Sequence, residues 1–590
     1  MTQVGSYGRI TGLASGMDTE SMVKQMIDAE SYRLNKYKQN QQWTDWKQEK
    51  YRNVNLDFAN FIVNSKKDME LSKNLSSGSS FNSSIDSVSW TKKVTSSNTA
   101  AVTATSTGTA VPGTYSVTVS QLAKGVQAAS AANLGDITAT SKLSNLGVTG
   151  SIDDLYINGK KIEKINSDGT KTSLDGDSTI KDLVNAINRS GAGVTASFDE
   201  GTGRFFVASN VTGAENAEFQ VTGGVTAAGE PDSSVVIGTQ ATALMNALDL
   251  NVTYTTYDVD GNASSMTEAL DLTKAANGTY VGQDAKYSFA GAEGLTSSTN
   301  QVSINGVNMV FNTEGTTTVA VETDIDGIIE KVKKLFETDY NGLIDKLTSQ
   351  LNEKTYRDYQ PLLDEERDEM TDEQIEKWET MAKSGTIRND MLISSTLSSL
   401  RSTLYEEVEG DGIDSDYDAL YKVGIKTKSY FDGGKSGQVE VDETKLREAL
   451  QDNPQAVVNL LFKDYSGSYT SSTISKEDKE ETKKQMGIVG RIYNEMTLGV
   501  KNIISKAGYG DEEDTLRNVN VGGSIFIDYV TSGGISLLDK ELNNLADQID
   551  LEQERLNDKE DRYYSQFTAM ETALSRMNSQ AGWLAQQFGG

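Results

Sequence analysis

The stretch ISLLDKELNNLADQIDLEQERLNDKEDRYYSQFTAMETALSRMNSQAGWLAQQF, residues 535–588, decides the fold of this chain. Its large apolar residues recur at steps of three and four, the spacing of one helix face, once Glu552 and Lys559 are counted as members of the same stripe. No Gly or Pro interrupts residues 535–581. The pattern therefore predicts one long amphipathic helix that runs to within two residues of the end of the sequence.

A second helical stripe lies near the start of the sequence. Asp18 or Thr19 can cap a helix, and Glu20 then falls in its first turn, where a negative charge is favourable. The apolar members of this stripe are Val23, Ile27, Leu34, Tyr37, Tyr51, Phe58 and Ile62. Intervening stripe positions are occupied by Glu30, Gln41, Thr44, Gln48 and Asn55. The N-terminal stripe is therefore imperfect, and on its own it predicts only a weak coiled coil.

The two stripes need partners, because a lone amphipathic helix in water has nothing against which to bury its apolar face. The most economical solution is antiparallel packing of the two ends, with the outermost turns completed by neighbouring molecules. A stalk satisfied entirely within one chain is the alternative. The candidate contact residues for neighbouring molecules are Val23, Ile27, Leu34, Tyr37, Ile549, Leu556, Tyr563, Phe567, Met570, Leu574, Met577, Trp583, Leu584 and Phe588.

The middle of the chain, residues 76–318, is rich in Ser, Thr, Gly, Ala and Val and carries few charges. Residues 111–119 alternate between apolar and polar side chains, as in a half-buried strand. Asn158-Gly159 and Asn305-Gly306 each separate two short β-prone runs, which is a hairpin signal. One amphipathic helix is expected near residues 179–189. This region predicts one or two antiparallel β-rich domains.

Helical periodicity returns after the β-rich region. The expected elements are a helix from Asp326, a helix that begins at the capping box Thr371-x-x-Gln374, helices over 392–404, 443–450 and 454–462, a strand over 439–441 and a polar loop over 466–484. The fold class is therefore α+β and multidomain, with a coiled-coil leg, a helical domain and an inserted β-rich region. The expected domains are a leg of residues 1–45 with 545–590, a mainly helical stalk of 46–80 with 320–544, and a β-rich head of 81–319.

Composition excludes several classes of function. The chain has 590 residues and a formal net charge of −30, and it contains no cysteine and no histidine. A strongly negative chain repels phosphate backbones and anionic lipid, so neither nucleic acid nor a membrane is expected as a partner. Disulfides, thiolate nucleophiles and imidazole bases are impossible. We expect no catalysis, no cofactor and no metal site.

The residues that form these patterns resemble those of a known family, the flagellar filament cap or hook-associated protein 2 family. Gly12-Leu13-Ala14-Ser15-Gly16-Met17-Asp18-Thr19 is similar to its N-terminal signature, and residues 113–123 are similar to that of its first β domain. Residues 179–209 resemble an insert motif that flagellins share. Residues 446–462 and 566–584 resemble the family's C-terminal patterns. The resemblance spans essentially the whole chain.

This resemblance implies a structural cap at the distal end of the bacterial flagellum, which retains exported flagellin and promotes its folding and polymerisation. It implies a ring of copies whose residues 1–45 and 545–590 contact flagellin. Hook–filament junction proteins and a cytoplasmic export chaperone are further implied partners. Residues 1–24 lack the basic and apolar regions of a secretory signal, which agrees with the implied export through the flagellar channel without a cleaved signal peptide.

Three other functions are weighed against the cap. A hook–filament junction protein or a divergent flagellin belongs to the same structural class, but the terminal motifs favour the cap. A surface adhesin that binds glycans through the β-rich head is suggested by polar loops. However, Trp90 is the only tryptophan between residues 47 and 377, whereas glycan sites usually present clustered aromatic residues. A hydrolase that uses carboxylates is the enzymatic alternative.

Overall fold

The computed structural model describes residues 16–74, 80–166, 168–232, 234–259, 261–272, 279–428, 437–470, 474–509 and 534–588. The chain divides into two compact units, Met1–Ile85 with Ile325–Gly590 and Asp86–Asp324. We call them the helical unit and the β unit. Residues 12–15 of the N-terminal signature lie outside the described residues.

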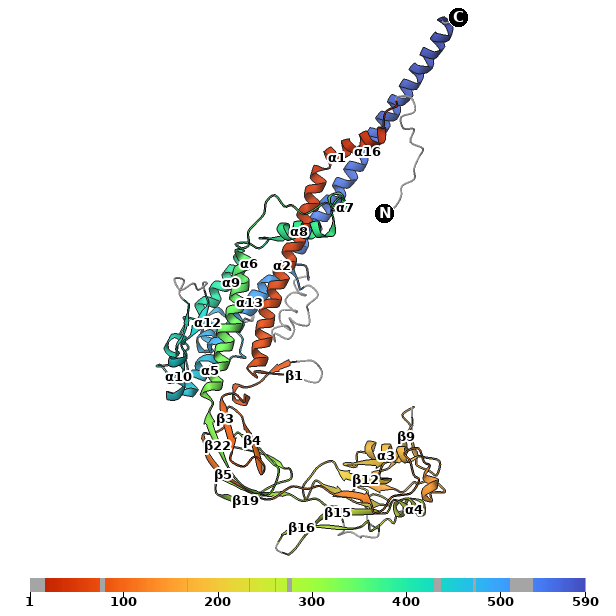
Figure 1. Ribbon diagram of the computed structural model, residues 1–590, viewed down its shortest axis with the longest axis vertical. Coiled ribbons are helices and arrows are strands. Elements are labelled where there is room, and N and C mark those ends of the chain that lie inside the picture. The colour runs from red at the N-terminus through yellow and green to blue at the C-terminus, as the bar shows by residue number, and fades with distance from the viewer. Residues whose placement is uncertain are drawn as a thin grey trace. The chain divides into compact units, whose positions relative to one another are not determined.

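The helical unit combines segments from both ends of the sequence (Figure 1). Its described helices are α1 (Thr19–Glu30), α2 (Tyr32–Asp68), α5 (Ile325–Lys333), α6 (Asn341–Leu351), α7 (Asp364–Asp368), α8 (Asp372–Lys383), α9 (Met391–Thr403), α10 (Glu443–Asp452), α11 (Pro454–Phe462), α12 (Lys476–Gln485), α13 (Ile488–Ala507) and α16 (Leu537–Phe588). A π-helical segment, Lys334–Tyr340, joins α5 to α6. Its short strands are β1 (Ser72–Asn74), β2 (Ser80–Asn82), β23 (Ile425–Thr427) and β24 (Val439–Val441).

Side-chain caps explain why several helices begin where the sequence predicted. The Thr371 hydroxyl accepts a hydrogen bond from the Gln374 amide at 3.4 Å, and the Gln374 side chain accepts one from the Thr371 amide at 3.0 Å. Asn453 caps α11 through the Ala456 amide at 3.1 Å, and Pro454 follows in the first turn. Each cap satisfies a backbone N–H that has no partner inside the helix. The predicted helices at these positions are confirmed.

The prediction that residues 466–484 form a loop is wrong over its second half, because α12 occupies Lys476–Gln485. The Ser475 hydroxyl accepts a hydrogen bond from the Asp478 amide at 3.1 Å and caps the helix. Acidic residues lie in its first turn and lysines in its last, which complements the helix dipole. This helix has no apolar stripe, so periodicity gave no sign of it.

The core of the helical unit is built around α13, which contacts α2, α9 and α11. Nearly every residue of α13 is buried, including Ile492, Met496 and Ile503. A helix with buried residues on most of its sides must be surrounded by other elements. α13 therefore holds together segments that lie far apart in the sequence.

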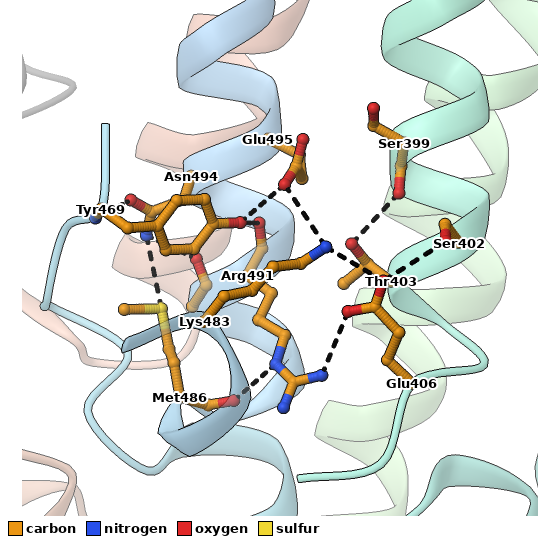
Figure 2. A network of polar contacts seen from close by, with 11 residues as sticks. Ser399, Ser402, Thr403, Glu406, Tyr469, Lys483, Met486, Arg491, Asn494 and Glu495 are labelled. Carbon is orange, nitrogen blue, oxygen red and sulfur yellow. Dashed lines mark hydrogen bonds and ion pairs between the residues drawn. The ribbon is translucent and has the colours of Figure 1, made fainter. Parts of the chain in front are cut away.

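A buried polar network fixes the segment before α13 to this core (Figure 2). The Arg491 side chain is fully buried and donates hydrogen bonds to the carbonyl oxygens of Met486 at 2.8 Å, Lys484 at 2.7 Å and Glu407 at 2.9 Å. Its Nη1 atom lies 3.5 Å from a carboxylate oxygen of Glu406. Burial lowers the pKa of Arg491, and the Glu406 carboxylate opposes this shift. Three backbone carbonyls therefore depend on one buried guanidinium.

Tyr469 and Lys483 complete the same network (Figure 2). The Tyr469 hydroxyl donates to a Glu495 carboxylate oxygen at 2.8 Å, and burial together with that carboxylate raises the pKa of Tyr469. The Lys483 ammonium lies 3.0 Å from Glu406 and 3.8 Å from Glu495. The carboxylates of Glu406 and Glu495 are therefore contacted by two cations and a phenol. These contacts offset the free-energy cost of removing the carboxylates from water.

The β unit contains two hydrophobic clusters, each covered by antiparallel sheets. The first cluster lies between a five-stranded sheet, β19-β18-β5-β22-β3, and a three-stranded sheet, β20-β21-β4. The bounds are β3 (Lys92–Ser96), β4 (Val102–Ser106), β5 (Gly113–Gln121), β18 (Ala285–Phe289), β19 (Ala292–Ser297), β20 (Gln301–Ile304), β21 (Val307–Phe311) and β22 (Gly315–Thr323). The strand predicted over 111–119 appears here as β5.

The second cluster is covered by a seven-stranded sheet and smaller ribbons, with α3 (Ile180–Arg189) and α4 (Thr239–Leu248) packed on it. The strands are β6 (Gln127–Ser130), β7 (Tyr156–Ile157), β8 (Lys160–Lys161), β9 (Glu163–Ile165), β10 (Lys171–Ser173), β11 (Val194–Asp199), β12 (Arg204–Ser209), β13 (Glu218–Phe219), β14 (Val221–Thr222), β15 (Leu250–Tyr257), β16 (Ala263–Ala269) and β17 (Tyr280–Val281). The helix α3 was predicted, and α4 was not.

Both predicted Asn-Gly hairpins are confirmed. β7 pairs with β8 across Asn158-Gly159, and β20 pairs with β21 across Asn305-Gly306. All four turn residues have positive φ, from 48° at Asn158 to 77° at Gly306, which is the backbone conformation of a tight hairpin turn.

The predicted α+β class, with antiparallel β structure inserted between helical ends, is confirmed. The predicted boundaries after residues 45, 80 and 319 stay predictions; the two compact units meet at 85/86 and at 324/325. Within the described ranges, none of the helices combines the length and the apolar content that a membrane crossing requires.

Candidate assembly interface on the terminal helices

The N-terminal helix pair begins at a side-chain cap. A carboxylate oxygen of Asp18 accepts a hydrogen bond from the Ser21 amide at 3.1 Å, and Glu20 lies in the first turn of α1, as predicted. α1 ends at Glu30, and α2 begins at Tyr32. The intervening Ser31 keeps near-helical dihedral angles, φ −76° and ψ −1°, so the second helix continues closely from the first.

The C-terminal helix α16 packs antiparallel to this pair (Figure 1). Near its start, the Gln48 side-chain amide donates to the Asp539 carboxylate at 2.6 Å. Further along, the Tyr563 hydroxyl donates to the Glu30 carboxylate at 2.5 Å. Residue numbers rise along α16 while they fall along α2 and α1, so the predicted antiparallel pairing is confirmed.

The polar members of the two stripes pair with one another across the helices. Glu30 forms an ion pair with Lys559, and Nη1 of Arg555 lies 3.7 Å from the same carboxylate. Burial alone would raise the pKa of Asp539, and hydrogen bonds from Ser536 and Gln48 lower it below its usual value. Polar pairs within an apolar helix interface favour one register of the two helices, because any shift along the helix axis would leave charges without partners. The imperfections of the sequence stripe therefore fix how the helices align.

The predicted contact residues fall into three groups along this leg. Val23, Leu34 and Leu556 are buried within the chain, at 1%, 6% and 2% exposure. An intermediate group consists of Ile27, Tyr37, Ile549, Tyr563, Phe567, Met570 and Leu574. An exposed group consists of Met577, Trp583, Leu584 and Phe588, at 55%, 59%, 47% and 83% exposure.

The exposed group belongs to a segment of α16 that is open on every side. Every residue from 575 to 588 is exposed, whereas Glu571 is still buried. We call residues 575–588 the open end of α16. Arg576 is its only charged residue, although the chain as a whole carries a net charge of −30. The open end is therefore a long, nearly uncharged helix surface with large apolar side chains in contact with water.

A second group of exposed apolar residues, on the N-terminal helices, was not predicted from the sequence. Met22, Met26 and Tyr32 are 40%, 37% and 72% exposed. They do not belong to the stripe that contains Val23. The four-residue interval between Met22 and Met26 was the available signal, because residues at that interval share a helix face.

We expect that Glu30→Lys separates α1 from α16, since the introduced ammonium group would face the cations of Arg555 and Lys559. The change should raise amide hydrogen exchange over residues 19–30 about tenfold, which corresponds to roughly 1.4 kcal/mol of local stability for these partly exposed ion pairs. Asp28→Lys is the matched control, because Asp28 lies exposed in the same helix and outside its first turn. Lys559→Glu added to Glu30→Lys should restore protection, and failure of this rescue would contradict the pairing.

Comparisons with known proteins place these helices in context. The profile described as flagellar hook-associated protein 2 C-terminus matches residues 282–579, and the one for the N-terminus of the same protein matches residues 15–125. A third profile, the flagellin hook IN motif, matches residues 154–211. This match confirms the resemblance predicted for residues 179–209, which form α3, β11 and β12.

Individual relatives agree with the profiles. Flagellar hook-associated protein 2 of Halalkalibacterium halodurans is 30% identical over 596 aligned residues, which cover 98% of this chain and 99% of the relative. The protein of the same name from Thermotoga maritima is 24% identical, over 77% of this chain and 60% of the relative. A crystal structure of the D1-D2-D3 domains of the flagellar cap protein FliD from Escherichia coli aligns with 77% of this chain and 95% of its own, at 20% identity and a TM-score of 0.43.

The profile matches follow the order of the two helical ends and the β unit along the sequence, and the first relative matches over nearly its whole length. On these matches, the chain belongs to the flagellar hook-associated protein 2 family.

Proposed function

We propose that this protein attaches to the flagellar filament through the open end of α16, residues 575–588. Family membership assigns the role itself: the protein is a structural cap at the distal end of the bacterial flagellar filament, where it retains exported flagellin and promotes its folding and polymerisation. The observation that carries the proposed attachment is the exposure of Met577, Trp583, Leu584 and Phe588 on a helix whose earlier stripe residues, Leu538 and Leu556, are buried within the chain.

Burial of these four side chains on a neighbouring subunit supplies the driving force. Since full burial of a large apolar side chain contributes about 1.5–3 kcal/mol and these are already partly covered, the four together contribute roughly 4–7 kcal/mol before ordering costs. Because every residue of this helix end is exposed, part of this free energy orders the end on binding. Attachment through this surface is therefore stable only where a complementary helix face is available.

Charge favours the same segment as the point of contact. Copies with a net charge of −30 repel one another, and the open end carries a single positive charge, Arg576. Contacts made through it avoid the acidic surface of the remaining chain. Added salt screens the remaining repulsion, so we expect it to promote assembly.

The proposal also includes specific partner proteins. We assign the open end to the helices of flagellin at the tip, within a ring of copies of this chain, and we include the hook–filament junction proteins as neighbours before filament growth. The exposed apolar side chains of the open end need a binding partner for export, and we assign this role to a cytoplasmic export chaperone. Export through the flagellar channel without a cleaved signal peptide and the lack of catalytic activity complete this proposal. Family membership favours the cap over the junction-protein and adhesin alternatives.

The test is a chain with Trp583→Ser, Leu584→Ser and Phe588→Ser. Because these residues are exposed, we expect an unchanged melting temperature but at least a hundredfold weaker binding to filament ends, measured by sedimentation with sheared filaments. The matched control replaces three exposed apolar residues of the helical unit that lie outside residues 1–45 and 545–590, namely Met391, Tyr421 and Leu537, by Ser. Equal binding of the two variants would refute attachment through the open end.

A further inference from the structure

The strand β16 forms an edge of the seven-stranded sheet in the β unit (Figure 1). It pairs antiparallel with β15 in unbroken register, from Ala263 opposite Tyr257 to Ala269 opposite Asn251. Among the described residues, no strand pairs with its other side. Unlike a central strand, β16 therefore presents one row of backbone groups away from the sheet.

The hydrogen bonds to β15 fix which residues form that row. The Leu270 amide donates to the Leu250 carbonyl at 2.7 Å, and the Asp258 amide donates to the Asn262 carbonyl at 3.1 Å. Residues directed toward the partner alternate along an antiparallel strand, so the even-numbered residues of β16 face β15. The outward row consists of the backbone groups of Ala263, Ser265, Thr267 and Ala269.

This edge has few of the features that usually prevent strands from associating, and Glu268 is its single charged residue. Natural edge strands carry lysine, proline or a bulge. The sequence of β16, ASSMTEA, contains neither lysine nor proline, and its pairing with β15 has no bulge. By contrast, the edge strand β3 begins with Lys92 and Lys93, and the edge strand β19 is paired through a bulge.

The outward row is complementary to itself. When two copies of β16 are placed antiparallel with Met266 opposite Met266, Ser265 lies opposite Thr267 and Ala263 opposite Ala269. These four residues direct their backbone groups outward, so each would donate one hydrogen bond to the second copy and accept one from it. The two strands would form about eight such bonds in total. Glu268 would lie opposite Ser264, and no two like charges would meet.

The side chains around Met266 also favour a strand pair centred on that residue. Met266 is 46% exposed and lies opposite Tyr254, whose hydroxyl is 3.5 Å from the Met266 sulfur and donates to Glu268 at 3.0 Å. Tyr254 belongs to the hydrophobic cluster beneath the sheet. In the pair, Met266 of the second copy would extend the apolar surface of Met266 and Tyr254 beyond the edge of the sheet. Glu268 is the only charged residue of β16, so two acidic chains meet there with little repulsion.

We infer that the outer edge of β16 is a pairing surface for a second copy of this chain, formed by two antiparallel β16 strands centred on Met266. The contact has two-fold symmetry, so it joins chains in pairs and cannot by itself close a ring. It lies in the β unit and does not depend on the open end of α16.

The absence of natural cysteine allows a test that is specific for register. At the centre of such a pair, the two Met266 Cα atoms lie about 4.5 Å apart, within the range that a disulfide spans. The full chain with Met266→Cys should form a covalent dimer under mild oxidation. Ser265→Cys alone and Thr267→Cys alone should form at least tenfold less, and a mixture of these two variants should crosslink.

Two controls complete this test. Met391→Cys, at an 85% exposed site in the helical unit, measures crosslinking by random collision. Met266→Lys, which places two ammonium groups opposite each other, should abolish the dimer in sedimentation velocity without lowering the melting temperature. Selective crosslinking of Met266→Cys and of the mixed pair supports the inference. Equal crosslinking of all variants, or none above the Met391→Cys level, overturns it.

Discussion

A chain that lacks residues 545–590 is expected to leave flagellin secreted into the medium and unpolymerised. The deletion removes the open end of α16, which is the proposed attachment surface, together with the part that pairs with Glu30, so we expect the cap to lose its attachment to the filament. The β unit has its own two hydrophobic clusters and should keep its fold. Filament length and the amount of monomeric flagellin in the medium measure the effect in a strain that makes only the shortened chain.

A shorter deletion separates loss of attachment from damage to the leg. A chain that ends after Leu574 keeps the contacts of Glu30 with Lys559 and Tyr563 and lacks only the open end. We expect it to lose filaments as completely as the longer deletion, while residues 19–30 stay as protected from hydrogen exchange as in the full chain. Filaments of normal length from the shorter deletion would show that the open end is not the attachment surface.

Replacement of the buried arginine, Arg491→Met, should have the largest effect on stability. Methionine fills much of the volume but donates no hydrogen bond, so the carbonyls of Met486, Lys484 and Glu407 and the carboxylate of Glu406 lose a partner. Removal of one partner from a buried charged network costs about 3–5 kcal/mol. Urea unfolding followed by the helical circular dichroism signal measures this loss.

The neighbouring Lys484→Met is the matched control. The Lys484 ammonium forms an ion pair with Glu409 at 3.4 Å, and both side chains are about 60% exposed. An exposed pair of this kind contributes less than about 1 kcal/mol. The backbone carbonyl of Lys484, which Arg491 uses, is unchanged by the substitution. Equal stability of the two variants would mean that the network of Figure 2 does not hold α13 in place.

Local patterns in the sequence predicted those parts of the fold that depend on neighbouring residues. The capping box at Thr371, the Asn-Gly turns at residues 158–159 and 305–306 and the stripe of α16 each follow from spacings of a few residues. The antiparallel pairing of the terminal helices also followed, because their stripes had no other partner of comparable length. In these regions local preference and tertiary structure agree.

α12 and α13 are among the helices that were not predicted, and they escaped prediction for different reasons. α13 is buried along most of its length, and the buried polar residues Arg491, Asn494 and Glu495 interrupt its apolar residues. α12 has no buried residue and depends on its cap and on charges placed along the helix dipole. Periodicity identifies a helix by an apolar stripe beside a polar face; buried polar residues obscure this pattern in α13, and α12 has no apolar residue to form it.

The candidate interface was only partly predictable. The two stripes identified Phe588 together with Val23 and Leu34, and Trp583 was identified beside the C-terminal stripe. No local pattern separates residues that the chain covers itself from those that it leaves open. That distinction depends on where α1 begins relative to α16. The pairing of Glu30 with Lys559 likewise joins residues more than 500 positions apart, so their register becomes visible only in the folded leg.

Hydrogen exchange on the dilute subunit tests the central claim most directly, since that claim requires the end of α16 to find its partners on other molecules. The account predicts that amides of residues 575–588 exchange within seconds in the isolated subunit, that those near Leu556 are protected, and that the end becomes protected once the cap is bound to filaments. Full protection out to Phe588 in the dilute subunit would contradict it.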